Sequence, residues 1–341
     1  MKQLPENSDT LRVSLEEAKG IVSEVFDLSP PSVSKDLLFQ AAMYSLRSGK
    51  AVYKGRRVVV KEYRLEDITA RAVNILRSNE PLKGYYLAFS GGKDSCVIKH
   101  LAHLAGINYE PRYNNTTIDP PELVRFIKEY HKDVLWNNPL TGNMFHRIAT
   151  TLKTPPTRKG RWCCEEYKEQ GGGRESIKII GVRAAESPRR AKLWKEITED
   201  IRGGTVICPI VSWSDGDVWD FIRFHKLPYC SLYDEGWERL GCVGCPLVSK
   251  KKQDREFARW PRYEELWRKS IIANWETNKD LLNTRTGEPR YQAKFATGED
   301  FWTWWRTEKR PDVMRECQSG RLFTNVDEEE NDLKEETEIA A

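Results

Sequence analysis

Short apolar runs alternate with polar, glycine-containing turns through the middle of the chain. Residues 85–89 form an apolar run typical of a buried strand, and residues 96–102 follow with the apolar spacing of a helix. Further strand patterns lie at residues 107–113, 177–182 and 206–210, and further helical patterns lie at residues 121–130 and 215–224. Pro121 suits a first helical turn and Ser214 suits an N-cap. This alternation predicts an α/β fold with a doubly wound parallel sheet, whose ligands bind at the carboxyl ends of strands.

The pattern changes on both sides of this core. We expect a head of helices plus a hairpin, the core, a tryptophan-rich helical C-terminal region, and an acidic disordered tail, at residues 1–80, 81–250, 251–325 and 326–341. The head suits either a nucleic-acid or partner module or a packing element that covers an edge of the core sheet. Of these two, we favour the packing element.

Composition narrows the class of protein. Hydrophobic residues make up 39% and charged residues 31% of the 341 positions, and no apolar run approaches the roughly 20 residues of a membrane span. The first ten residues lack the apolar core of a signal peptide. We therefore expect a cytoplasmic protein without a membrane partner, in which the eight cysteines serve metal or redox chemistry rather than disulfides.

The net charge of +4 hides an uneven distribution. The segment 326–341 carries eight acidic residues and one lysine, so the rest of the chain is more basic than the total suggests. A basic body suits anionic ligands such as nucleotides or nucleic acid. Six of the twelve tryptophans lie between Trp260 and Trp305 among basic residues, a combination that can bind single-stranded nucleic acid by stacking. The helical spacing of Trp260 and Trp267 is more typical of core packing.

A hexapeptide after the first core strand is the strongest single motif. Its residues are Ser90, Gly91, Gly92, Lys93, Asp94 and Ser95, and they stand between a strand pattern and a helix pattern. Glycines allow close backbone approach to a phosphate, and the free N–H groups of a first helical turn attract anions. Lys93 adds a point charge suited to pyrophosphate. The alternative is a plain glycine turn with a capped helix. The motif resembles the PP-loop of the adenine nucleotide alpha-hydrolase superfamily, which implies adenine nucleotide binding.

Two cysteine pairs form a second candidate site. Cys163 and Cys164 are adjacent, and Cys242 and Cys245 form a C-x-x-C turn. A C-x-x-C turn brings two sulfurs to one metal, and four thiolates suit either tetrahedral zinc or a [4Fe–4S] cluster. Cys96, Cys208 and Cys230 lie in apolar contexts typical of buried thiols.

Five ordered motifs resemble the phosphoadenosine phosphosulfate (PAPS) reductase family. They occupy residues 160–168, 181–190, 209–219, 227–236 and 241–246. The resemblance implies a [4Fe–4S] cluster held by Cys163, Cys164, Cys242 and Cys245, with zinc as the alternative. It also implies that the bound sulfate or phosphate is contacted by Arg161, Lys168, Arg183, Glu186, Ser187 and Arg190. In this family a nucleotide segment precedes these motifs, and it matches residues 114–122 only loosely, with Thr117 and Asp119 near the nucleotide.

The chain departs from assimilatory reductases at its C-terminal end. Those enzymes attack sulfate with a cysteine in a Glu-Cys-Gly-hydrophobic-His motif, whereas this chain has Cys317 followed by Gln318 and Ser319, with no histidine after His225. Cys317 is a candidate nucleophile only if nearby cations such as Arg315 and Arg321 lower its pKa. A lysine at the position of Lys93 is familiar in PP-loop enzymes that split ATP into AMP and pyrophosphate. The four cysteines without a reductase tail also resemble DNA-phosphorothioation subunits.

Three functions follow from this pattern. The favoured one is ATP-dependent adenylation and sulfur transfer to an acceptor, with nucleic acid as one such acceptor and a cysteine desulfurase as a sulfur-donor protein. Lys93 would hold pyrophosphate and Asp94 would hold Mg²⁺. The second is reduction of adenylyl sulfate or PAPS to sulfite, with Cys317 as nucleophile and a thioredoxin-like protein or glutathione as reductant. The third is a catalytically inactive nucleotide-binding protein.

Overall fold

The computed structural model describes residues 10–27, 35–48, 50–169, 171–173, 176–199 and 204–307. Cys317, the end of the tryptophan-rich region and the predicted acidic tail lie outside these residues. Within them the chain forms two compact units. The first contains the head, the central sheet and the segment up to Gly241, and the second contains residues 116–118, 138–169 and the chain from Cys242 onward. No helix in the described ranges is both long enough and apolar enough to cross a bilayer.

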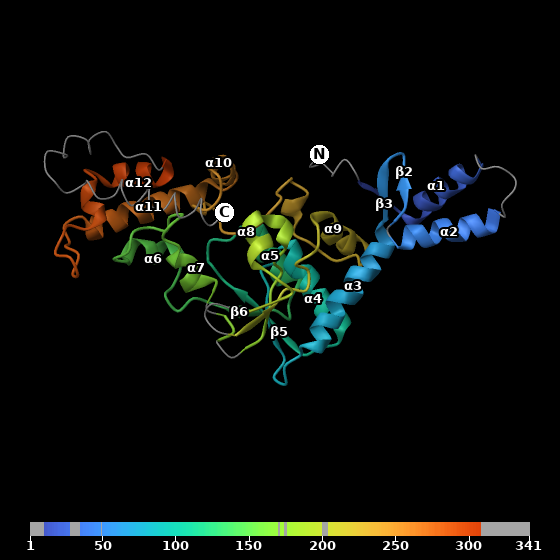
Figure 1. Cartoon of the computed structure of the whole chain (residues 1–341). Helices are drawn as coiled ribbons and strands as arrows, with labels where there is room; N and C mark the ends of the chain where they lie inside the picture. Colours follow the sequence, from blue (N-terminus) through green and yellow to red (C-terminus); the bar gives the residue numbers. More distant parts are fainter. Residues whose placement is uncertain are drawn as a thin grey trace. The chain divides into compact units, whose positions relative to one another are not determined.

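The first unit is built on a six-stranded sheet (Figure 1). Its strands, in spatial order, are β6 (Leu135–Asn137), β5 (Tyr109–Asn114), β4 (Tyr85–Ala88), β7 (Lys178–Ile179), β9 (Thr205–Ile207) and β8 (Ile197–Glu199). Every neighbouring pair is parallel except β8 with β9, which is antiparallel at the edge of the sheet. This topology confirms the predicted α/β class with a mostly parallel sheet. The central strand β4 carries the buried side chains of Tyr85 and Leu87 and leads into the glycine loop.

The core helices of this unit follow the strands in the predicted order, except that the helix at residues 188–193 was not predicted. They are α4 (Lys93–Ala105), α5 (Pro121–Tyr130), α8 (Pro188–Leu193) and α9 (Asp215–Phe224), with short 3₁₀ turns η1 (Ala184–Glu186) and η2 (Ser231–Tyr233). Both α5 and α9 have the expected bounds. Proline occupies the first turn of α5, and the Ser214 hydroxyl caps α9 by accepting the Asp217 N–H.

The head adds a small sheet of its own. Strands β1 (Thr10–Val13), β3 (Arg56–Val60) and β2 (Val52–Tyr53) lie in that order, with α1 (Leu15–Asp27) and α2 (Lys35–Arg47) beside each other and α3 (Lys61–Ser78) leading into the core. The β2–β3 hairpin was predicted, whereas β1, which pairs in parallel with β3, was not. Helix α3 packs mainly against α4 and α9. Arg71 on α3 also pairs with Glu196, next to the edge strand β8, at 2.6 Å.

A buried ion network joins the head to the core within this unit. The carboxylate of Asp217, on α9, is 1% exposed and accepts hydrogen bonds from Arg64 Nε and Nη2, both at 2.7 Å. Arg12, on β1, donates a third from Nη2 at 2.8 Å. Burial alone would raise the pKa of Asp217, but the hydrogen bonds from Arg64, Arg12 and Ser214 outweigh it and hold the pKa well below its usual range.

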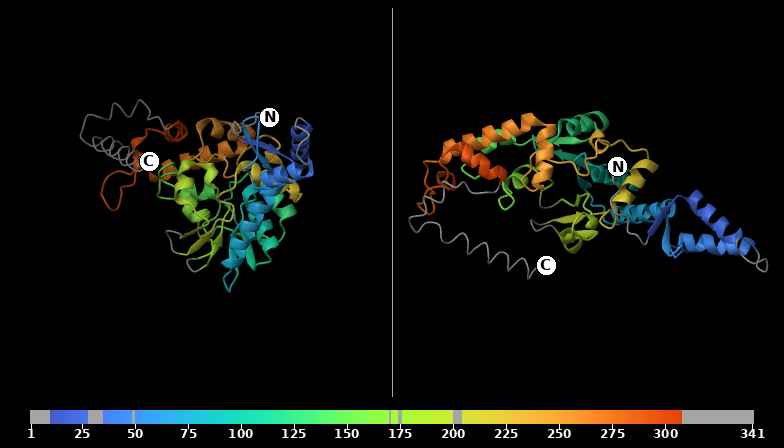
Figure 2. Two further views of the ribbon diagram at one scale, coloured as in Figure 1. Left: turned by 45° about the vertical axis from the view of Figure 1, so that its right-hand side comes forward. Right: turned by 90° about the horizontal axis from the view of Figure 1, so that it is seen from above.

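The second unit is helical. It contains α6 (Met144–Thr150), α7 (Trp162–Tyr167), α10 (Lys250–Arg259), α11 (Pro261–Asn278), α12 (Gly298–Thr307) and the 3₁₀ turn η3 (Tyr291–Lys294). Helices α11 and α12 lie side by side, in orange and red in Figure 2. Their contact buries Trp267 and Trp305, whose rings stack with centroids 4.7 Å apart. Trp260 and Trp275 are buried as well, so these four tryptophans serve packing.

Candidate functional site: a glycine loop and a four-thiol turn

The glycine loop lies between β4 and α4 and has the backbone that an anion cradle needs. Gly91 has a φ of +73°, which only glycine adopts without strain, and a Cβ there would come within 2.8 Å of Ile127 and Leu123. Gly92 is the N-cap of α4. The hydroxyl of Ser95 donates to the Gly92 carbonyl at 2.8 Å, and the hydroxyl of Ser90 lies 3.3 Å from that of Ser95. The loop is therefore closed by its own two serines at the N-terminus of α4.

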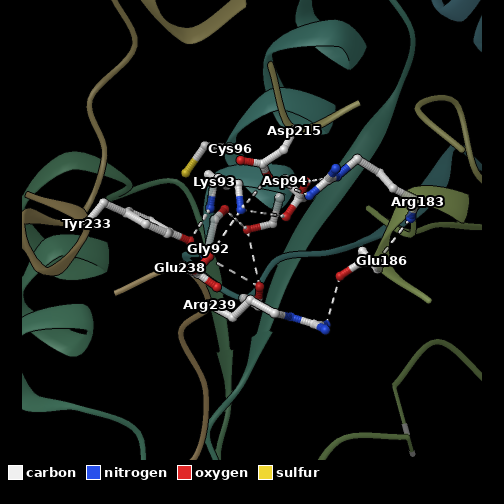
Figure 3. Close-up of polar contacts among 12 residues, drawn as sticks. Gly92, Lys93, Asp94, Cys96, Arg183, Glu186, Asp215, Tyr233, Glu238 and Arg239 are labelled. Carbon is white, nitrogen blue, oxygen red and sulfur yellow. Dashed lines mark hydrogen bonds and ion pairs between the residues drawn. The ribbon is translucent and has the colours of Figure 1, made fainter. Parts of the chain in front are cut away.

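The side chain of Lys93 is buried, at 4% exposure, and lies among oxygen atoms (Figure 3). Its Nζ is 3.1 Å from Asp215 Oδ1, donates to the Glu238 carbonyl at 3.2 Å, and is 3.9 Å from Asp94 Oδ2. It also lies 5.5 Å from the ring centroid of Tyr233. The backbone N–H of Lys93 donates to the Tyr233 hydroxyl at 2.9 Å. Both donor groups of Lys93, its backbone N–H and its ammonium, thus have oxygen partners within the chain.

Arg183 approaches the loop from the segment after β7. Its Nε donates to Asp94 and its Nη2 donates to Asp215 Oδ1 at 2.9 Å, while its side chain is 5% exposed. Gly181 makes this approach possible, because a Cβ there would come within 3.1 Å of the backbone of Asp94. Two of the predicted cations, Lys93 and Arg183, are therefore brought to the same place and share Asp215.

Glu186 organises the neighbouring cations. Its carboxylate accepts the backbone N–H of Arg183 at 3.1 Å and pairs with Arg190 and, at 2.7 Å, with Arg239. Burial would raise the pKa of Glu186, but the hydrogen bond from Arg183 and the charges of Arg190 and Arg239 lower it. Ser187 caps α8 by accepting the Arg190 N–H. Glu186 and Ser187 thus hold the arginines in place, whereas we had predicted direct contact with the anion, a role that stays a prediction.

The two predicted nucleotide residues on the loose motif lie in different units. Asp119, 6% exposed, accepts the Tyr113 hydroxyl at 2.6 Å in the first unit. Thr117, in the second unit, has a φ of +64°, and its hydroxyl accepts the Met144 N–H at 2.8 Å. Both side chains are thus engaged in internal hydrogen bonds.

Residues absent from our predictions complete the site. Two of them lie inside motifs, Asp215 in the motif at 209–219 and Tyr233 in the motif at 227–236. The other two, Glu238 and Arg239, closely follow the second of these motifs. Their spacing alone carried no sign of contact with Lys93. The sequence feature that could have identified two of them is that Asp215 and Tyr233 lie inside motifs shared with sulfonucleotide enzymes.

The four predicted thiols all lie in the second unit. None forms a disulfide, and each is partly exposed. Cys163 hydrogen-bonds to Cys164 and interacts electrostatically with Cys242 and Cys245, which raises the pKa of Cys163. The same hydrogen bond and the adjacent Arg161, whose Nη2 is 3.7 Å from the Cys164 sulfur, lower the pKa of Cys164 to about 6. Two predicted anion ligands, Arg161 and Lys168, lie in the same unit as these thiols and close to Cys164, and their contact with an anion stays a prediction.

The C-x-x-C turn is held by residues that carry no thiol. Gly244 has a φ of +75°, its N–H donates to the buried Glu256 carboxylate at 2.8 Å, and its carbonyl accepts from Gln253 at 3.1 Å. Trp267 Nε1 donates to the Val243 carbonyl at 2.9 Å. In the described part of the chain, no group of three or more histidine, cysteine, aspartate or glutamate side chains is arranged to hold a metal ion. The four thiols match an iron–sulfur cluster in number and in type of ligand, although the described side chains are not arranged around one common metal position.

Comparison with known proteins decides the family. Residues 84–248 match the family model of the phosphoadenosine phosphosulfate reductase domain. The core of this chain is a PAPS reductase family domain. Over 262 residues the chain is 29% identical to an uncharacterized protein of Methanocaldococcus jannaschii, covering 73% of this chain and 60% of that protein. Over 88 residues it is 33% identical to the adenosine 5'-phosphosulfate reductase of Staphylococcus haemolyticus, covering 26% of this chain and 36% of that enzyme.

The PAPS reductase family domain also has a distant likeness among solved structures. The phosphoadenylyl-sulfate reductase of Candida auris is similar with a TM-score of 0.38 and 15% identity, covering 56% of this chain and 96% of that chain. A likeness of this size carries no functional conclusion. The chain spans less than two thirds of the length of the curated relatives given above. What is established is therefore the family of the core domain, residues 84–248, whose named relatives include enzymes.

Proposed function

We propose that this protein is an iron–sulfur enzyme that uses ATP to adenylate an acceptor and then transfers sulfur to it. The observation that carries the proposal is the position of Lys93, buried at the N-terminus of α4 directly after a two-glycine turn and next to Arg183. Two cations at a helix N-terminus suit the charge of a departing pyrophosphate. The acceptor is proposed to be nucleic acid, because the body of the chain is basic.

The residues of the loop divide the work of binding. Lys93 and Arg183 would stabilise the negative charge that develops on the leaving phosphates. The hydroxyls of Ser90 and Ser95 and the glycine turn would position the phosphates against α4. Asp94 would hold Mg²⁺ through a carboxylate oxygen, the kind of ligand that Mg²⁺ prefers, in exchange for its present contacts with Lys93 and Arg183. The cluster would be held by four thiolates, those of Cys163, Cys164, Cys242 and Cys245. When bound, it would supply a charged redox centre.

Reduction of adenylyl sulfate is the second candidate. One observation favours it, the 33% identity with an enzyme named adenosine 5'-phosphosulfate reductase over 88 residues. This reaction would use Cys317 as the nucleophile and a thioredoxin-like reductant.

Product analysis separates the two candidates. Anaerobically purified protein is incubated with ATP and Mg²⁺, or with adenylyl sulfate and a dithiol. An acceptor nucleic acid and a sulfur donor are added to the ATP mixture, where we expect release of pyrophosphate. In the adenylyl sulfate mixture we expect no sulfite. Sulfite release that is abolished by Cys317→Ser would overturn the proposal in favour of reduction. Binding of ATP without turnover in either mixture would leave a nucleotide-binding protein.

Iron content tests the proposed ligands directly. Anaerobic protein is expected to contain iron and sulfide in equal amounts and to absorb in the visible range. The double substitution Cys242→Ser and Cys245→Ser should remove both signals, because half of the thiolate ligands are lost. Cys208→Ala is the matched control, since this buried thiol lies in the other unit and faces an apolar cluster. Bound zinc in place of iron would contradict the cluster.

A further inference from the structure

Asp215 bridges the two cations of the glycine loop although it follows the loop by more than a hundred residues. One carboxylate oxygen, Oδ1, lies 3.1 Å from Lys93 Nζ and 2.9 Å from Arg183 Nη2 (Figure 3). Asp94 contacts the same two cations, through Oδ1 to Arg183 and, at 3.9 Å, through Oδ2 to Lys93. The four side chains form two positive and two negative charges, so the group is neutral.

Exposure separates Asp215 from the rest of the group. The side chain of Asp215 is 48% exposed, whereas Lys93 is 4% and Arg183 is 5% exposed. The side chain of Asp215 is thus partly open to solvent, whereas the two cations that it contacts are almost completely buried. An anion that arrives from solution meets the negative charge of Asp215 before it reaches Lys93, and at this range like charges repel.

A ligand oxygen at the position of Asp215 Oδ1 would contact both Lys93 Nζ and Arg183 Nη2, so it competes with this carboxylate. Lys93 has three N–H donors, of which one points at Asp215 and one at the Glu238 carbonyl. When the ligand takes the place of Asp215, the carboxylate loses two charge-assisted contacts, each of which is stronger than a neutral hydrogen bond. A ligand that carries a divalent cation offsets this loss, because the cation compensates the carboxylate that has been released.

We propose that Asp215 is a specificity-determining residue that occupies the place of the ligand anion at Lys93 and favours a metal-bearing polyphosphate over a metal-free anion. The inference rests on the proposed function, since it takes the glycine loop as the anion site. It goes further by assigning to one carboxylate the choice between Mg²⁺-polyphosphate and free sulfonucleotide. Asp215→Asn keeps the shape of the side chain and removes its charge.

Titration calorimetry with inorganic pyrophosphate, with and without Mg²⁺, tests the inference on the full chain. We expect Mg²⁺ to tighten binding to the unaltered protein, and Asp215→Asn to bind metal-free pyrophosphate about tenfold more tightly and to respond less to Mg²⁺, as removal of one charge-assisted competitor predicts. Asp220→Asn is the matched control. Asp220 lies on the same helix as Asp215, but its carboxylate pairs with Arg12 and Arg223 instead of Lys93. Asp215→Ser repeats the test without an amide.

The outcomes separate this inference from the proposed function. Equal metal-free affinity in the unaltered protein and both Asp215 variants would overturn the inference and leave pyrophosphate binding by the loop intact. Absence of pyrophosphate binding in every variant would overturn both. A gain in affinity for Asp220→Asn as large as that for Asp215→Asn would show a general charge effect and overturn the role of Asp215.

Discussion

Replacing Lys93 by alanine is expected to lower the rate of pyrophosphate release from ATP by about 10²–10³-fold, the usual effect of removing one preorganised stabilising group. The physical reason is burial. Lys93 is 4% exposed, so its charge acts at short range with little screening by water. Steady-state kinetics with saturating ATP measures the effect.

Lys99→Ala is the matched control for this prediction. Lys99 lies on the same helix, α4, and pairs with Asp133 and His131 away from the loop. It should leave the rate close to that of the unaltered protein. Circular dichroism spectra and melting temperatures of both variants exclude loss of fold. A Lys93→Ala protein that retains full kcat and KM would remove the lysine from the mechanism.

Replacing Asp217 by asparagine is expected to lower the free energy of unfolding by about 3 kcal/mol at neutral pH, since it removes charge-assisted hydrogen bonds from two arginines at a buried site. Arg12 and Arg64 would then face an amide that also donates hydrogen bonds. Urea unfolding followed by circular dichroism measures the difference. Glu66→Gln, which breaks an exposed pair with Arg47, should cost less than about 1 kcal/mol.

The same ion network predicts a pH dependence with a definite sign. The pKa of Asp217 is lower in the folded protein than in the unfolded chain, where it is about 3.9. Its contribution is therefore complete above about pH 4 and is lost as the pH falls toward the folded pKa. The stability difference between the unaltered protein and Asp217→Asn should shrink below about pH 4. A difference that is constant from pH 7 to pH 3 would contradict the assignment.

Local signals in the sequence predicted the elements that are marked by caps and long apolar patterns. Helices α5 and α9 begin where Pro121 and Ser214 indicate. Strands β6 and β8 were not predicted, because each has three residues and at least one polar position. β7 pairs over only Lys178–Ile179, although the Ile180 N–H still donates to the Ile207 carbonyl of β9 at 3.1 Å. The apolar side chains of Ile180 and Val182 pack against the cluster around Val206 and Val211.

Some residues of the candidate site could likewise be predicted from local sequence, and others could not. The glycine turn, Lys93, Asp94 and Arg183 could be proposed from motifs because each motif is a contiguous stretch. The partners of Lys93 could not, since Tyr233 and Glu238 are separated from it by 140 and 145 positions and only folding brings them together. The placement of Arg161 and Lys168 beside the thiols also depends on which compact unit each segment joins.

The hydrogen bonds that hold the C-x-x-C turn lower the entropy cost of binding a ligand at its thiols. Its backbone is fastened by Glu256, Gln253 and Trp267, which sit on helices of the same unit and supply no sulfur. The conformational entropy of ordering this turn is therefore lost when the helices fold, and not again when a ligand arrives. Ligand binding at these thiols is therefore expected to leave the backbone of the turn unchanged.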